Sequence, residues 1–200
     1  MDATQLIHPL LALALAPLMA GIVNKTKSAF AGRNGPPVLQ PYRDLWRLLH
    51  KGAVYSRTTS WILRAGPIVS LAAVVTALAM LPFGGTAAPL SFAGDLIVFA
   101  YLFGLVRFLM VAAALDTGSS FEGMGASREV TFSALAEPAL LLALAALARM
   151  AGSPSLSGLL AGAVAYPAVS IPVLLLAAAA VGIVLLAENA RIPVDDPNTH

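Results

Sequence analysis

Three ionisable residues of this chain, Arg107, Glu137 and Glu188, lie inside or at the end of long apolar segments. A charge at the centre of a lipid bilayer costs about 3 kcal/mol or more unless it is paired or hydrated. Residues of this kind therefore indicate either a buried ion pair that holds helices together or a polar chamber through which ions or protons move.

Arg107 and Glu137 are expected at similar depths on consecutive helices. Arg107 lies eight residues before Leu115, where one apolar segment ends, which corresponds to about 12 Å at about 1.5 Å per residue. Glu137 lies six residues after Thr131, where the next segment starts, or about 9 Å by the same rise. We therefore predict that the two side chains meet, directly or through water.

Two interpretations of this pair stay open from the residues alone. In one, the pair only joins two helices, or Arg107 extends to the lipid headgroups. In the other, it belongs to a hydrated site or a proton relay. Pro138 favours the second interpretation, because proline lacks an N–H group and its ring displaces the carbonyl of Ala134 beside the carboxyl group of Glu137.

The composition is that of a membrane protein. Of the 200 residues, 58% are hydrophobic and 11% are charged, against about 25% charged in soluble domains. The mean hydropathy is +0.83. A transmembrane helix needs about 20 mostly apolar residues. We predict an all-α, polytopic transmembrane bundle forming one membrane domain over 1–200, with five spans at approximately 6–23, 66–81, 94–115, 131–150 and 169–187.

The basic residues indicate the orientation of the chain. Eight of the twelve lie in Asn24–Ala65, whereas Pro82–Ala93 has none. Because cytoplasmic loops carry the excess of Lys and Arg, we predict an N-terminus outside and a C-terminus in the cytoplasm. The same pattern explains the net charge of +2 without nucleic acid as a partner. Residues 116–130, which contain Gly118, Gly123, Gly125 and Arg128, are expected to form a glycine-rich inner loop.

The long basic segment contains a predicted amphipathic helix over 41–51. Pro41 suits the first turn of a helix. Apolar residues then recur at helical spacing on one face, at Tyr42, Leu45, Trp46 and Leu49. Such a helix lies in the membrane interface. A lipid-surface anchor and a docking site for partners are both open.

Redox chemistry is not expected on this chain itself. It has no cysteine, so it cannot hold a thiolate-ligated iron–sulfur cluster. The three histidines are too scattered along the sequence to predict a metal site. Any redox centres of a larger machine would therefore lie on other chains.

The last residues carry the most specific motif. Residues 187–197 read AENARIPVDDP, which resembles the AExxRxPxD signature of the quinone-site membrane subunit of respiratory complex I and its relatives. Gln40-Pro41 with Asp44, Gly125 and Arg128, and Glu137 nine residues after Arg128 fit the family in the same order. Residues 116–119 and 193–200 most resemble the branch found in energy-converting nickel–iron hydrogenases, including formate hydrogenlyase.

The resemblance implies a membrane-anchoring and ion-coupling subunit of a multi-subunit oxidoreductase complex in a bacterial or archaeal cytoplasmic membrane. Such a subunit links a peripheral redox arm to proton or sodium translocation. The implied partners are other membrane subunits, including antiporter-like ones, and peripheral hydrogenase-like and iron–sulfur subunits that carry the clusters and the nickel–iron centre. Whether the chain itself takes part in catalysis is left open.

Two other functions stay open. One is the quinone-chamber subunit of a complex I-type NADH–quinone oxidoreductase, with quinone as its ligand. The other is a stand-alone ion transporter or a passive membrane anchor. The first would be distinguished by an NADH-oxidising module among its partners. The transporter is disfavoured because the sequence shows no second half with matching broken helices.

The resemblance also assigns roles to residues. The polar chamber would comprise Arg107, Glu137 and Glu188. Contacts between inner loops and the peripheral arm would come from Arg128, Arg191, Asp195 and Asp196. The interfacial helix would use Gln40, Tyr42, Asp44, Leu45, Trp46 and Leu49. Pro193 and Pro197 predict an irregular, stiff tail, for which a solvated connector is the other interpretation.

The length of the chain adds one further expectation. Members of the family continue for roughly another hundred residues with about three more spans. We therefore expect this sequence to be part of a longer protein.

Overall fold

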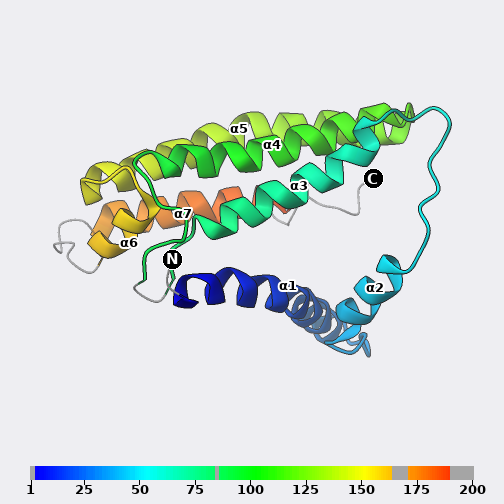
Figure 1. Ribbon diagram of the computed structural model, residues 1–200, viewed down its shortest axis with the longest axis horizontal. Coiled ribbons are helices and arrows are strands. Elements are labelled where there is room, and N and C mark those ends of the chain that lie inside the picture. Colours follow the sequence, from blue (N-terminus) through cyan, green and yellow to red (C-terminus); the bar gives the residue numbers. More distant parts are fainter. Residues whose placement is uncertain (1–2, 84–85, 164–170, 190–200) are drawn as a thin grey trace. The chain divides into compact units, whose positions relative to one another are not determined.

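The computed structural model describes residues 3–83, 86–163 and 171–189. These residues form seven helices and no strand beyond a single bridge between Phe83 and Thr86. Five helices are long and apolar enough to cross a bilayer, so the predicted all-α architecture with five spans is confirmed (Figure 1). They are α1 (Ala3–Phe30), α3 (Ile62–Ala79), α4 (Asp95–Asp116), α5 (Ser120–Ala151) and α7 (Ile171–Glu188).

The chain divides into two compact units, Met1–Tyr55 and Ser56–His200. The first unit contains α1 and the short helix α2 (Gln40–Leu49). The Tyr42 hydroxyl on α2 donates a hydrogen bond to the carbonyl of Ala14 on α1, at 2.6 Å. A Cβ atom at Gly21 of α1 would overlap the carbonyl oxygen of Val38. The missing side chain of Gly21 therefore lets the segment before α2 approach α1.

Helix α2 has the predicted amphipathic character. Proline stands in its first turn, and the Gln40 side chain donates to the carboxylate of Asp44 at 3.0 Å. Tyr42 is used in the contact with α1, whereas Leu45, Trp46 and Leu49 stay exposed. These three apolar side chains suit a helix that lies in the membrane interface. Its role as a lipid anchor or a docking site stays a prediction.

In the second unit, α4 packs against α3 and α5, and α5 also packs against α7 and α6 (Leu156–Ala163). Gly66 of α3 brings that helix close to α4, where a Cβ would lie 3.6 Å from the side chain of Ala113. The backbone N–H of Ser60 donates to Asp116 at 2.8 Å and joins the start of α3 to the end of α4. Small residues at such positions allow transmembrane helices to pack closely.

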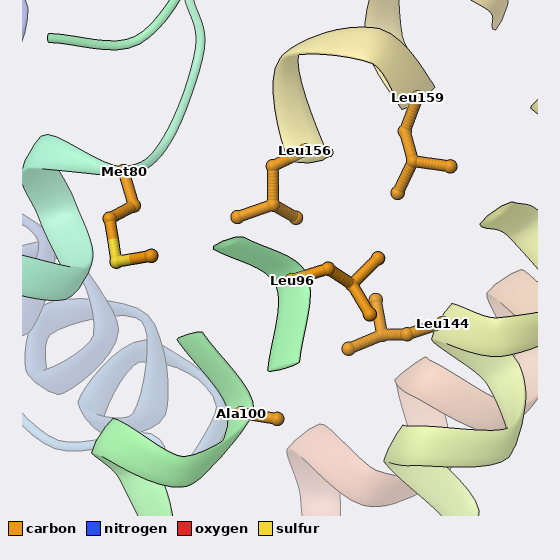
Figure 2. Packing of buried hydrophobic residues seen from close by; sticks show 6 residues of the cluster. All are labelled: Met80, Leu96, Ala100, Leu144, Leu156 and Leu159. Carbon is orange, nitrogen blue, oxygen red and sulfur yellow. The ribbon is translucent and has the colours of Figure 1, made fainter. Parts of the chain in front are cut away.

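The hydrophobic core of this unit gathers residues from three helices and the residue that directly follows α3. Figure 2 shows Met80, which follows α3, with Leu96 and Ala100 of α4, Leu144 of α5, and Leu156 and Leu159 of α6. Met80 is 1% exposed. The cluster therefore holds α6 against the first turns of α4 and the second half of α5.

The predicted inner loop over 116–130 is wrong. Gly118 has a positive φ of 70° and turns the chain, but α5 already begins at Ser120 and continues for 32 residues. This helix is about 48 Å long at about 1.5 Å per residue, which exceeds a hydrocarbon core of about 30 Å. Helical glycine costs only about 1 kcal/mol each, so Gly123 and Gly125 do not prevent the extension of α5.

Other bounds differ more modestly from the predicted spans. Helix α1 continues to Phe30 and α3 begins at Ile62, so both extend further toward the basic segment than expected. Helix α6 was not predicted, because its eight residues are too few for a span and include glycine. Helix α7 agrees with the predicted fifth span from Ile171 onward. The expectation of one membrane domain stays a prediction.

Single-cysteine labelling tests the orientation, since the native chain has no cysteine. Lys51 lies before α3, Ala87 lies between α3 and α4, and Ser119 lies after α4. We expect cysteines at Lys51 and Ser119 to react from the cytoplasmic side of sealed vesicles, and a cysteine at Ala87 to react from the opposite side. Labelling of Lys51 and Ala87 from one side would contradict the arrangement of α3 as a span.

Candidate ion-coupling site

Arg107 of α4 is buried, with 6% of its surface exposed. One guanidinium nitrogen, Nη2, lies 2.7 Å from Oε1 of Glu188 at the end of α7, and the other, Nη1, lies 3.4 Å from Oε1 of Glu137 on α5. The predicted approach of Arg107 to Glu137 is therefore confirmed. The structure adds the shorter contact to Glu188, so that a single cation ties three spans together.

The charges of this cluster do not cancel. One guanidinium faces two carboxylates, which leaves one excess negative charge when all three groups are ionised. An uncompensated charge within membrane spans is costly. Binding of one proton or one small cation would neutralise the cluster.

The contact between Arg107 and Glu137 leaves room for water. Nη1 of Arg107 makes no hydrogen bond to any described residue, although the carboxylate oxygen is 3.4 Å away. A cavity of about 20 Å³ adjoins both side chains and is otherwise lined by Ala100, Tyr101, Leu140 and Leu141. A water needs about 10–15 Å³ and two or more polar partners. The cavity is therefore large and polar enough for one bridging water.

A larger groove of about 540 Å³ opens beside the same pair, between α4 and α5. Its wall includes Ser133 and Ala134, which precede Glu137 on α5. Because Pro138 has no N–H, the carbonyl of Ala134 lacks the usual helical partner four residues later. The groove therefore combines a carboxylate, a guanidinium and a hydroxyl with a carbonyl that helix geometry leaves without its donor. Its remaining lining residues are Tyr101, Gly104, Leu105, Phe108, Val111 and Val130.

Gly104 positions Glu137 against α4. A Cβ atom at Gly104 would lie 3.4 Å from Oε1 of Glu137, so a side chain larger than alanine would displace the carboxylate. Gly104 precedes Arg107 by three residues and therefore lies on the same face of α4. Sequence reasoning did not identify this glycine, because apolar spans commonly contain glycine.

Asp95 is a polar residue that sequence reasoning missed. It lies in the first turn of α4 and is 0% exposed. Its carboxylate accepts hydrogen bonds from the N–H of Leu156 at 2.8 Å, the hydroxyl of Ser155 at 3.0 Å and the N–H of Phe92 at 3.3 Å. Asp95 therefore caps the N-terminus of α6 from a neighbouring helix, twelve residues before Arg107 along α4.

The residues predicted to contact a peripheral arm are only partly described. Arg128 lies in α5 and not in a loop, with its guanidinium 5.9 Å from the centre of the Phe132 ring. Arg191, Asp195 and Asp196 fall outside the described residues. Among the residues that are described, no group of three or more side chains is placed to hold a metal ion.

Comparison with known proteins identifies the family. The profile described as NADH dehydrogenase matches residues 3–200, nearly the whole chain. The chain belongs to the NADH dehydrogenase family. This agrees with the resemblance carried by the AENARIPVDDP segment, by Arg128 and by Glu137.

Two relatives from Escherichia coli (strain K12) belong to hydrogenase systems. Formate hydrogenlyase subunit 4 is 38% identical over 191 residues, which cover 95% of this chain and 62% of that protein. Hydrogenase-4 component C is 35% identical over 190 residues, which cover 95% of this chain and 60% of that protein. The chain thus spans about three fifths of the length of these relatives.

A solved structure shares the fold. A chain of the membrane-bound sulfane sulfur reductase, an archaeal respiratory membrane complex, matches with a TM-score of 0.79 and 27% sequence identity. The match covers 92% of this chain and 60% of that chain. Together with the five apolar helices, these relatives identify a multi-pass membrane protein of the NADH dehydrogenase family.

Proposed function

We propose that this chain is the membrane-anchoring and ion-coupling subunit of an energy-converting hydrogenase similar to formate hydrogenlyase. The observation that carries the proposal is the sharing of Arg107 between Glu137 and Glu188. In this function, electron transfer on a peripheral arm drives movement of protons or sodium ions in the membrane. The bacterial relatives named for formate hydrogenlyase and hydrogenase-4 support the hydrogenase branch.

The unequal ion pairs supply a physical basis for coupling. Arg107 contacts Glu188 at 2.7 Å but Glu137 only at 3.4 Å. Protonation of either carboxylate weakens its attraction for the guanidinium and strengthens the relative hold of the other. A proton taken up at Glu137 would therefore favour the Arg107–Glu188 pair, and a proton at Glu188 would favour the Arg107–Glu137 pair. Since the carboxylates stand on α5 and α7, such an exchange connects a protonation step to the contacts between spans.

The cytoplasmic end of the bundle is the proposed docking side. In the predicted orientation, Glu188 at the end of α7 lies on this side, and the first turns of α5, which carry Arg128, extend beyond the length that a bilayer requires. Arg128, Arg191, Asp195 and Asp196 are the proposed charged contacts to peripheral hydrogenase-like and iron–sulfur subunits. The iron–sulfur clusters and the nickel–iron centre would lie on those subunits. The proposed location is a bacterial or archaeal cytoplasmic membrane, with the C-terminus of this chain inside.

Purification in a mild detergent tests the proposed function. A tagged copy of the full-length protein in its native host should co-purify with a nickel–iron large subunit, iron–sulfur subunits and antiporter-like membrane subunits. Mass spectrometry of the purified complex identifies them. Recovery of an NADH-oxidising module without a nickel–iron subunit would contradict the hydrogenase assignment.

Such a result would favour the second candidate, a quinone-chamber subunit. The groove of about 540 Å³ supports this candidate, because aromatic side chains of Tyr101 and Phe108 line it beside Arg107 and Glu137. A photoreactive quinone should then label peptides of α4 and α5, and the label should decrease when an excess of unmodified quinone is present.

Charge reversal tests the docking residues. We expect Arg191→Glu or Asp196→Arg to release at least half of the soluble subunits from the membrane while this chain stays inserted, because attraction to the partner becomes repulsion. Quantitative immunoblots of membrane and soluble fractions provide the measurement. Arg57→Glu, in the basic segment before α3, is the control. Full retention of an active soluble arm in both variants would favour a solvated tail instead.

A further inference from the structure

A second groove lies at the first turn of α4, and it shares one lining residue, Leu141, with the small cavity beside Arg107. The groove has a volume of about 560 Å³ and runs between the first turn of α4, at Leu96 and Ile97, and the last three turns of α5. Along α5 it extends from Leu141 to Gly152, which is eleven residues or about 16 Å. This is about half of a hydrocarbon core of about 30 Å. The groove therefore has the depth of one membrane leaflet.

The wall and the rim of this groove differ in polarity. The wall is formed by aliphatic side chains, including Ile97, Leu141 and Ala145. At the rim stand Arg149 and Ser153. The Ser153 oxygen accepts a hydrogen bond from the N–H of Ser155 at 3.3 Å and packs against Gly158 of α6, and a hydroxyl that accepts one hydrogen bond can also donate one. The rim therefore offers a guanidinium and a hydroxyl above an apolar slot.

Arg149 is unusual in its position. In the predicted orientation it is the one basic residue of the twelve at the extracytoplasmic border, against the usual bias of Lys and Arg toward the cytoplasm. It is exposed, and within residues 3–83, 86–163 and 171–189 it forms no ion pair. Arg149 lies in the last turn of α5, where the helix dipole favours a cation by about 0.3–1 kcal/mol. The helix dipole alone accounts for a cation at this position but not for the groove beside it.

We propose that this groove binds an anionic phospholipid of the extracytoplasmic leaflet. The phosphate would lie against the guanidinium of Arg149 and the hydroxyl of Ser153, and an acyl chain would lie along Leu141, Ala145 and Ile97. Guanidinium groups match phosphate oxygens in geometry as well as charge, and the leaflet-deep apolar slot matches an acyl chain. The ligand would fill the space between α4 and α5 next to the core cluster that holds α6.

Site-specific photo-crosslinking in native membranes tests this proposal. A photoreactive amino acid at Ala145 of the full chain, within its assembled complex, should capture lipid. Mass spectrometry of the adducts gives the ratio of phosphatidylglycerol to phosphatidylethanolamine. Attraction of one Lys or Arg to an anionic lipid surface is worth about 1 kcal/mol, which converts to a ratio of about five, so we expect about fivefold enrichment over the bulk membrane. The matched control is Leu175 of α7, which is 66% exposed and lies near the start of α7, on the same side of the membrane as the groove in the predicted orientation. At this position the bulk ratio is expected.

Variants separate the headgroup contact from general lipid exposure. Arg149→Ala should return the ratio at Ala145 to the bulk value, whereas Arg57→Ala should leave the enrichment unchanged. The comparison of Ala145 with Leu175 needs neither variant and so holds even if Arg149→Ala accumulates poorly. Equal ratios at the two positions would overturn the proposal. Adducts at Ala145 to another subunit instead of lipid would overturn it in favour of a protein neighbour.

Discussion

The double replacement of Glu137 and Glu188 by glutamine is expected to destabilise the protein far more than the two single replacements together. Each single variant leaves Arg107 one carboxylate, at 2.7 Å or 3.4 Å. The double variant leaves a guanidinium that is 6% exposed and that has no other ion-pair partner among residues 3–83, 86–163 and 171–189. An uncompensated buried charge costs about 3–5 kcal/mol. In each single variant the glutamine amide oxygen can still accept from Arg107, so the loss is the difference between a charged and a neutral hydrogen bond, about 1 kcal/mol.

Thermal unfolding in a mild detergent measures this difference. The unfolding temperature should fall little in each single variant and steeply in the double variant, since groups within one network do not contribute additively. Adding Arg107→Met to the double variant should recover most of the loss, because the charge that lacked a partner is gone. Glu122→Gln, at an exposed position in the first turn of α5, is the matched control with no expected change. Additive losses in the double variant would contradict the sharing of Arg107.

Replacement of Asp95 by alanine is the second variant from which a large effect is expected. The variant removes a fully buried carboxylate that accepts from Leu156, Ser155 and Phe92. Hydrogen bonds to a charged group contribute about 1.5–3 kcal/mol each, and the N-terminus of α6 favours an anion. We expect a loss above about 3 kcal/mol, with a smaller loss in Asp95→Asn, which keeps one acceptor oxygen, and about 1.5–3 kcal/mol in Ser155→Ala, which removes one of the three bonds.

Hydrogen exchange locates the effect of the Asp95 replacement. Amides at the start of α6, Leu156 to Leu160, should exchange faster in Asp95→Ala than in the unchanged protein, while amides of α4 around Arg107 should keep their protection. The expected contrast follows because Asp95 caps α6 but lies twelve residues from Arg107. Unchanged exchange in α6 would show that the cap does not hold this helix.

The spans and the Arg107–Glu137 pair were predictable, because both follow from local sequence. Apolar runs identify helices of membrane length, and residue counts from the ends of a run give depth. The bond from Arg107 to Glu188 was not predictable from depth alone, because 81 residues separate the two positions and the pairing depends on how α7 packs beside α5. Glu188 itself was identified by the family motif, not by its geometry.

Two errors in the sequence interpretation have physical causes. Gly123 and Gly125 suggested a loop, but a long helix whose later turns are held by packing tolerates glycine near its exposed start. Asp95 was overlooked, because its position near the start of a predicted span gives no sign of the carboxylate contacts made by Ser155 and Leu156, 60 and 61 residues later. Contacts between distant segments of this kind leave no local pattern.

The most direct test of the proposed coupling measures ion movement and electron transfer in the same inverted vesicles that carry the complex with Glu137→Gln. If the Arg107 cluster couples the two processes, the number of ions moved per electron should fall at least threefold while the soluble subunits stay bound and electron transfer continues. The matched control, Glu122→Gln, should leave the ratio unchanged. An unchanged ratio in Glu137→Gln, with normal activity, would contradict the ion-coupling role of this site.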